Sequence, residues 1–449
     1  MAQFTRRAKA AVAAAEERVP RVNVVLPSVS VDDASETDTS TRLRPLPWWG
    51  VALLIAATFG TGMAMIVPMA YSLAVRLEEL APGRTDALGY ILGIGSAATL
   101  VLAPLTGVLS DRTRSRWGRR RPFTVIGMVI GVASIPVMTF APNLVVLGLG
   151  WVLSTVGWGT TGASIGNWQA DRLPAQQRGR VSGLAGLAMQ TSPVIGIIVV
   201  SLVRSETFLV FLVPAAAAFI FVTLFLLFAR DQDSRDFPVN GRLTVGSLLR
   251  SYTFRPREVP DFAWNWIGRF VFFLGLTLTT SFTVYFLSQR LELPVAEVAT
   301  AQALMSALSI GTATLGAIGG GWLSDRMGRR KPFVLGGSIL VGLGCSASAF
   351  AHDLPSILLG SLTMSLGIAM YSAVGQALLL DILPQRETQA GRYMSIALLA
   401  QKIPGVFAPL AAPLLLGVGG TQNFTLLYLV AAALTVAGGL FVMGIRSEN

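Results

Sequence analysis

Long stretches without a charged residue restrict the fold of this chain more than any other feature. The run from Trp48 to Val75 has 28 uncharged residues, and about 20 apolar residues in a helix cross the hydrocarbon core of a bilayer. A second run, 122–170, has 49 residues, enough for two spans separated at Ala141-Pro142-Asn143. Because backbone groups in lipid must satisfy their own hydrogen bonds, we expect such segments to be transmembrane helices.

Twelve apolar segments of this kind can be counted, six on each side of a polar stretch. The sequence therefore predicts an all-α integral membrane protein with 12 transmembrane helices in two pseudo-symmetric six-helix bundles. We expect a disordered cytosolic tail (1–45), an N-terminal bundle (46–229), a cytosolic linker (230–261) and a C-terminal bundle (262–449). The segments lie near 48–75, 87–110, two within 122–170, 181–203, 207–229, 262–287, 297–323, 333–351, 354–380, 393–416 and 424–445.

Composition agrees with a membrane protein and excludes several kinds of site. Of the 449 residues 53% are hydrophobic and 13% are charged, whereas soluble domains carry about 25% charged residues. A single histidine, His352, excludes a histidine-based zinc or catalytic cluster, and a single cysteine, Cys345, excludes a disulfide framework. The net charge of +11 could suggest nucleic acid, but the arginines cluster between spans. We therefore predict no nucleic-acid partner.

The placement of the basic residues predicts the orientation in the membrane. Four short gaps, 112–121, 172–180, 326–331 and 386–392, carry 15 Arg or Lys residues. Because cytoplasmic loops are enriched in Arg and Lys, we expect these gaps, both termini and the linker to be cytosolic. High Ala, Gly and Arg usage suggests a bacterial cytoplasmic membrane. The gaps on the side opposite these four carry only Arg76, Arg84, Arg204 and Arg290.

Polar motifs at the predicted cytosolic ends occur twice, which indicates an internal duplication. Asp171-Arg-Leu-Pro174 returns as Asp381-Ile-Leu-Pro384, and Gln190-Thr-Ser-Pro193 returns as Gln401-Lys-Ile-Pro404. The offsets are 210 to 214 residues, and the matches come in the same order. The longest pair joins Gly107-Val-Leu-Ser-Asp111-Arg112, with Gly118-Arg119-Arg120-Arg121-Pro122-Phe123 after it, to Gly321-Trp-Leu-Ser-Asp325-Arg326, with Gly328-Arg329-Arg330-Lys331-Pro332-Phe333 after it.

The helix-end acids and arginines of these motifs predict a cytosolic latch. Charge pairs there can hold the two halves together in an outward-open state, and near-surface pairs are weak enough to break in each cycle. Gly107 and Gly321 would let helices approach closely. The alternative is that the charges only set the topology. The predicted latch residues are Gly107, Asp111, Arg112, Gly118, Arg119, Asp171, Arg178, Gly321, Asp325, Arg326, Gly328, Arg329 and Asp381.

Polar residues inside the spans are candidates for solute binding, because ionisable groups are costly there. Lys402 lies about ten residues into its span, a depth of ~15 Å, and either faces a cavity or makes a buried structural contact. Arg269 is either a solute contact or an arginine that snorkels to the interface. Amides and hydroxyls suit a neutral polyol, and Gln302, Tyr71 and Tyr285 are further polar candidates. The predicted binding residues are Asn167, Gln190, Arg269, Tyr371, Gln376, Gln401 and Lys402.

The duplicated Gly-x-Leu-x-Asp-Arg with a following Gly-Arg-Arg resembles the major facilitator superfamily over nearly all of the chain after residue 46. The form Ser-Asp-Arg with Arg-Trp-Gly-Arg-Arg-Arg-Pro-Phe resembles its glycoside–cation symporter branch, which includes sucrose carriers. The segments 177–183 and 390–394 also resemble this branch. The resemblance implies two six-helix bundles that alternate access to a central site. It also implies an acid in the tenth span, where this chain has Gln376.

The expected function is secondary active or facilitative transport of a small solute, a sugar or glycoside. No carboxylate lies inside a span, so uniport, coupling through Asp171 or Asp381, and an anionic solute remain open. Drug or organic-anion efflux is the alternative, and a non-transporting receptor or scaffold is the alternative from another class. We expect no catalysis and no cofactor apart from a coupling ion, H⁺ or Na⁺. The expected partners are the solute and membrane lipid, with the protein a monomer.

Overall fold

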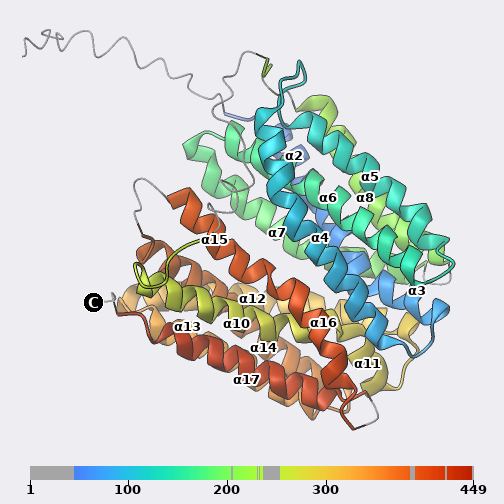
Figure 1. Cartoon of the computed structure of the whole chain (residues 1–449), viewed down its shortest axis with the longest axis vertical. Coiled ribbons are helices and arrows are strands. Elements are labelled where there is room, and N and C mark those ends of the chain that lie inside the picture. Colours follow the sequence, from blue (N-terminus) through green and yellow to red (C-terminus); the bar gives the residue numbers. More distant parts are fainter. Residues whose placement is uncertain are drawn as a thin grey trace, which may run out of the picture. The chain divides into compact units, whose positions relative to one another are not determined.

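The computed structural model describes residues 45–203, 206–229, 231, 233–235, 253–384, 390–419 and 422–446. The regular elements in these ranges are helices, without a strand (Figure 1). The predicted tail, except Pro45, and most of the predicted linker lie outside the described residues, so those two boundaries remain predictions.

The first six-helix set runs from Trp48 to Phe228, and the second from Pro260 to Val442. Eleven of the described helices are long and apolar enough to cross a membrane, or twelve if α10 and α11, bent by 50° at Phe282, form one span. This confirms the predicted fold class. The elements are α2 (Trp48–Val67), η2 (Pro68–Ser72), α3 (Leu73–Leu80), α4 (Thr85–Arg112), α5 (Arg121–Thr139), α6 (Leu144–Arg172), α7 (Ala175–Ser201), α8 (Thr207–Phe228), α10 (Pro260–Ser281), α11 (Thr283–Leu291), η3 (Val295–Glu297), α12 (Ala299–Met327), α13 (Lys331–Ala349), α14 (Leu354–Asp381), α15 (Ala390–Lys402), α16 (Pro404–Leu416) and α17 (Phe424–Val442).

The helix ends follow local sequence chemistry. The side chain of Asn143 caps α6 by accepting a hydrogen bond from Val146 N at 3.0 Å, and Asn423 caps α17 through Leu426 N at 2.9 Å. Helices α5 and α13 each begin with a basic residue followed by proline, the residue that best tolerates the first turn. Such caps fix where each span starts, and with it the position of the loops between spans.

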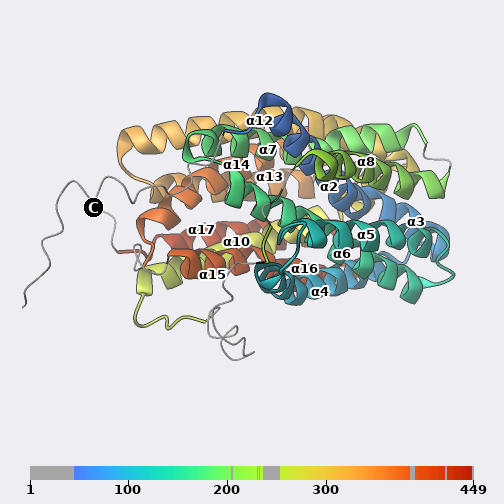
Figure 2. The same cartoon turned by 90° about the horizontal axis from the view of Figure 1, so that it is seen from above.

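Within each set, glycines bring helix backbones together. A Cβ on Gly157 of α6 would collide with the backbone of Gly131 on α5. In the second set, a Cβ on Gly438 of α17 would lie 2.6 Å from Phe272 N on α10. Small residues are used in this way in membranes, where close backbone packing replaces the hydrophobic effect between helices. Figures 1 and 2 show α5 beside α6 and α10 beside α17.

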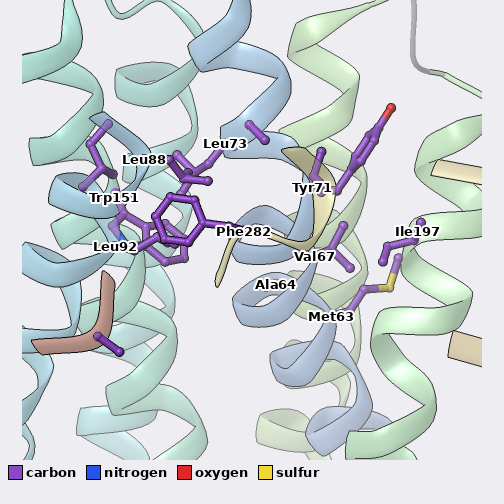
Figure 3. Packing of buried hydrophobic residues seen from close by; sticks show 14 of the residues in the cluster. Met63, Ala64, Val67, Tyr71, Leu73, Leu88, Leu92, Trp151, Ile197 and Phe282 are labelled. Atoms are coloured by element: carbon purple, nitrogen blue, oxygen red, sulfur yellow. The ribbon is translucent and has the colours of Figure 1, made fainter. Parts of the chain in front are cut away.

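The two sets meet along two helix pairs, α4 with α16 and α7 with α12 (Figures 1 and 2). Gly89 and Gly93 of α4 lie against Pro409 and Leu410 of α16. The bend between α10 and α11 adds a further contact, because Phe282 is fully buried beside Leu88, Leu92 and Trp151 of the first set (Figure 3). These contacts lie at the helix ends opposite the duplicated motif, which we call the far end; the other end is called the motif end.

Candidate functional site

At the motif end, the duplication extends to individual ion pairs. In the first set, Arg120 Nε lies 2.9 Å from Asp171 Oδ2; in the second, Arg330 Nε lies 2.6 Å from Asp381 Oδ2. Both members of the second pair are 210 residues beyond those of the first. The same atoms therefore meet in both halves, which makes Arg120 and Arg330 the centres of the two networks. Sequence reasoning named their neighbours Arg119 and Arg329 instead.

The rest of each network also stays within its own set. Asp111 lies 2.6 Å from Arg120, and Arg119 lies 2.9 Å from Asp171. In the second set, Asp325 lies 3.8 Å from Arg330. Each network thus brings together predicted latch residues of one half, and these ion pairs do not join the two halves in this conformation. Of the other predicted members, Arg178 donates to Leu173 O, Arg326 lies over the Trp322 ring, Arg329 is exposed, and Arg112 is half-buried at the end of α4.

The four predicted glycines have two different roles. Gly118 and Gly328 have φ of +84° and +61°, a conformation that favours glycine, and each turns the chain toward the next helix. The space beside Gly118 is filled by the Asp231 carboxylate, which accepts a hydrogen bond from Arg120 N at 3.1 Å. In contrast, a Cβ on Gly107 or Gly321 would meet nothing within 4 Å. The close helix approach predicted for these two is not made in this conformation.

Further glycines at the motif end are open in the same way. Gly179, Gly183 and Gly186 follow one another at helical spacing on α7, and a Cβ on any of them would meet nothing within 4 Å. Toward the far end, by contrast, the next residues of the same face, Gln190 and Pro193, line a cavity shared with α12. The two sets are therefore packed at the far end and separated at the motif end.

Hydrogen bonds at the far end connect the two sets through a π-helical turn in the first span. In this turn, η2, Ala70 O accepts from Gln302 Nε2 at 3.2 Å, and Tyr71 OH donates to Ala296 O at 2.6 Å. One turn later, Ala74 O accepts from Tyr285 OH at 3.4 Å. Because π-helical turns in α-helices often mark functional positions, η2 is a candidate functional element. We call η2, with the residues of these three hydrogen bonds, Ala70, Tyr71, Ala74, Tyr285, Ala296 and Gln302, the gate.

A cavity of about 280 Å³ lies next to this gate on its motif-end side, between α7, α11, α12 and α14. We call it the cavity below the gate. No charged residue is among its lining residues. The volume is near the lower limit for small-molecule sites, about 300 Å³, which suits a small solute. The polar lining residues, all amides or hydroxyls, are Gln190, Thr283, Gln302, Ser306, Ser309 and Ser361.

Of these lining residues, the sequence analysis assigned only Gln190 to solute binding and named Gln302 as a further candidate. The serines and Thr283 were missed, because small hydroxyls are frequent in membrane helices as packing residues. Their pattern carried a weak signal: Ser306 and Ser309 lie three residues apart and follow Gln302 by one and two helical turns. That spacing places them on one face of α12.

A second polar cluster brings together three of the predicted binding residues. Arg269 on α10 is buried and donates from Nη2 to Gln376 Oε1 on α14 at 3.2 Å. Tyr371, one helical turn before Gln376, stacks on Phe272 with ring centroids 3.6 Å apart and planes at 7°. Arg269 Nε, Tyr371 OH and Asn265 Oδ1 are buried without a hydrogen-bond partner among the described residues. The cluster lies within the second set and does not line the cavity below the gate.

The remaining predicted residues are spread over both sets. Asn167 on α6 and Gln401 on α15 are half-buried, and Lys402 is exposed. Lys402 lies two helical turns before Pro409, which packs against Gly89, so it occupies the side of this span that faces α4. Trp158, which could have stacked on a sugar ring, is buried against Gly131, and Trp168 lies edge-on to Phe225 with ring centroids 5.0 Å apart. Both belong to the core of the first set.

No group of histidine, cysteine and carboxylate side chains suited to holding a metal ion occurs in the described residues. The arrangement consists of two helix sets closed at one end around a polar cavity and separated at the other. A sequence model of the Major Facilitator Superfamily matches residues 48–320 and 266–448. The chain belongs to this superfamily. It is therefore a multi-pass membrane transporter and not an enzyme.

Short stretches of the chain are also similar to curated proteins. It is 33% identical over 96 residues to the general alpha-glucoside permease of Schizosaccharomyces pombe, covering 21% of this chain and 15% of that protein. It is 34% identical over 80 residues to a sucrose transport protein of Oryza sativa subsp. japonica, covering 16% and 15%. The matches thus span less than a sixth of either relative.

The fold as a whole is similar to a solved structure. A mutant of the nucleoside transporter NupG aligns with a TM-score of 0.72 over 89% of this chain and 100% of that one, at 15% identity. At that identity the likeness shows the fold and says nothing about the solute. The alignment covers 89% of this chain and therefore includes most of both helix sets.

Proposed function

We propose that this protein carries a small neutral polyhydroxyl solute, a sugar or glycoside, across a bacterial cytoplasmic membrane by alternating access. The observation that carries the proposal is the lining of the cavity below the gate. Six of its ten lining residues are amides or hydroxyls, and no lining residue is charged. Each amide or hydroxyl can donate and accept hydrogen bonds, which matches the hydroxyl groups of a sugar.

The lining also disfavours an amphiphilic drug as the solute. Its apolar members are Pro193, Val194, Met305 and Ile310, and no aromatic ring is among them. A site that buries a drug-sized molecule is usually larger and lined mainly by apolar and aromatic side chains. The names of the permease and the sucrose transport protein support a sugar as well, within the short matched stretches.

Transport in this proposal proceeds by exchange between the structure described here and one closed at the motif end. In the present state the solute reaches the cavity from the motif end, which we place in the cytosol on the basis of its Arg and Lys residues. Closure would bring α4 to α15 and α7 to the motif-end part of α12. The open glycines Gly107, Gly183 and Gly321 leave room for these approaches.

The test is uptake of radiolabelled sucrose, maltose and D-xylose into proteoliposomes, with an organic-anion panel in parallel. The proposal expects saturable uptake of at least one of the sugars. Uptake of organic anions alone would contradict it. Each arm is run with and without an inward proton gradient and with Na⁺ or K⁺ outside, so that the same experiment distinguishes uniport from coupling to H⁺ or Na⁺.

A second candidate, organic-anion transport, rests on Arg269. Its guanidinium is buried, and the partner the structure gives it is the neutral amide of Gln376. An isolated buried cation is costly, so an anionic solute could supply the opposite charge. Transport of the anion panel that is lost in Arg269→Gln, with the sugars not transported, would favour this candidate.

A further inference from the structure

Gln302 belongs both to the cavity and to the gate. It starts the second turn of α12, in the second helix set, and the residue is 7% exposed. Its amide nitrogen donates across the two sets to Ala70 O in the π-helical turn η2, at 3.2 Å. Its amide oxygen accepts no hydrogen bond from any described residue, although the residue lines the cavity.

These two observations fix the orientation of the amide. Because Nε2 is held by the Ala70 carbonyl, Oε1 is the amide atom left without a hydrogen-bond partner among the described residues, and it can only accept. A buried carbonyl oxygen without a donor costs free energy. A solute hydroxyl in the cavity is a donor of the required kind, and hydroxyls are the groups that the neighbouring Ser306, Ser309 and Ser361 also match.

The carbonyl to which Gln302 is tied is not an ordinary helical one. Ala70 lies in η2, between Pro68 and Tyr71, and Tyr71 makes the neighbouring link to Ala296 O of the second set at 2.6 Å. Opening of the far end must break both links. Gln302 is therefore the residue through which the cavity and the gate share one hydrogen-bonded group.

We infer that Gln302 is a specificity-determining residue that accepts a hydroxyl of the solute and thereby couples solute binding to the opening of the η2 gate. The inference rests on the proposed function, since it places a hydroxylated solute in this cavity. It predicts that a polyol hydroxyl bound at Oε1 is hydrogen-bonded to the same amide that ties the two sets together. Solute binding and gate opening then change together when Gln302 changes.

The test compares Gln302→Met with Gln422→Met. Met has nearly the same size as Gln and lacks both hydrogen-bonding groups. Gln422 is a matched control because its Nε2 also donates across the two sets at the far end, to Gly83 O at 3.5 Å, but it does not line the cavity. Each variant is made in a background in which the buried Cys345 is replaced by alanine and Ala296→Cys reports opening of the gate.

Two readouts are taken in proteoliposomes: the KM and maximal rate for the sugar that the wild type takes up, and labelling of Ala296→Cys by a membrane-impermeant maleimide with and without that sugar. For Gln302→Met we expect a KM raised by tenfold or more and no change of labelling on adding sugar. For Gln422→Met we expect the wild-type KM and the wild-type response to sugar.

Equal effects of the two substitutions would overturn the inference, because Gln302 would then be only one of several ties between the sets. An unchanged KM in Gln302→Met would overturn it as well. Failure of the proposed function has a different signature: the wild type itself then takes up none of the sugars, and adding them leaves the labelling of Ala296→Cys unchanged in every variant.

Discussion

Replacing Gly107 by leucine tests whether the open glycines at the motif end are the surfaces that close. In this structure a Cβ on Gly107 meets nothing within 4 Å, so the substitution fits the present state. It even gains about 0.8 kcal/mol or more of helix propensity. Any loss of transport must therefore come from another state of the cycle.

The contact between α4 and α16 shows what that other state would place against Gly107. A Cβ on Gly405 would lie 3.5 Å from Ser96 Oγ, so these two residues are neighbours. Gly93 and Gly89 contact residues further along α16. The two helices are antiparallel. Moving 11 residues, or three turns, from Ser96 reaches Gly107 on the same face, and the same step back from Gly405 reaches Met394 on α15.

If closure packs Gly107 against α15 near Met394, a leucine there overfills the contact by about 1–3 kcal/mol. That energy lowers the population of the closed state by about 5- to 150-fold. We expect turnover in proteoliposomes to fall by a factor in that range, with the fold retained. A cysteine placed at Gly186, which is open in this structure, offers a second readout. If closure protects this cysteine from a thiol reagent, Gly107→Leu should remove that protection.

The matched control is Gly311→Leu on α12. A Cβ on Gly311 also meets nothing within 4 Å, but its helix face carries the exposed Leu304, Leu308 and Leu315. We expect this apolar face, opposite the cavity, to contact lipid. We expect this variant to transport normally. Normal turnover of Gly107→Leu, or an equal loss in both variants, would refute the reasoning.

Three further predictions concern the motif end and the loops. Arg120 is 7% exposed and pairs with two carboxylates, so Arg120→Ala should lower the free energy of unfolding by about 3 kcal/mol. Arg330→Ala, with a 26% exposed side chain, should cost about 1 kcal/mol or less; equal shifts in detergent denaturation would contradict this order. Gly118→Ala should destabilise more than Gly328→Ala, because both have positive φ but only Gly118 faces a carboxylate, that of Asp231; thermal unfolding of the pair checks it. The pKa of Asp353 is held below its usual range, first by the hydroxyl of Ser356, which donates to the carboxylate. The stability it contributes should therefore be present at neutral pH and lost as the pH falls below about 4, whereas Asp353→Asn should lose that pH dependence, as thermal unfolding across pH would show.

The fold was predictable because long uncharged runs and repeated polar motifs are local properties of a sequence. The run after Trp48 predicted a span, and the Asp171 and Asp381 motifs predicted that two halves share one plan. Pro68 marks a possible kink inside the first span, but the uncharged run could not show that a π-helical turn, η2, begins there. The bend at Phe282 was hidden because no charge, glycine or proline marks it in the sequence.

The candidate site was predictable only in part, because it depends on which helices meet. Arg269, Tyr371 and Gln376 were selected as costly polar residues, and the structure does bring them together. The cavity below the gate, however, joins α7 to α12 across the two halves, and nothing in the spacing along one chain shows that Gln190 and Gln302 would share it. Ion-pair partners were missed for a related reason: Arg119 and Arg120 are adjacent, and only the helix geometry decides which one lies between two carboxylates.

Spin-label distances at the two ends of the bundle test the central claim of alternating access most directly. One label pair, at Trp117 and Met327, spans the two sets at the motif end, and a second pair, at Arg84 and Val418, spans them at the far end; all four side chains are exposed. The account predicts that adding a transported sugar populates a state in which the motif-end distance shortens while the far-end distance lengthens. Distances that stay fixed with a transported sugar, or that change in the same direction at both ends, would contradict it.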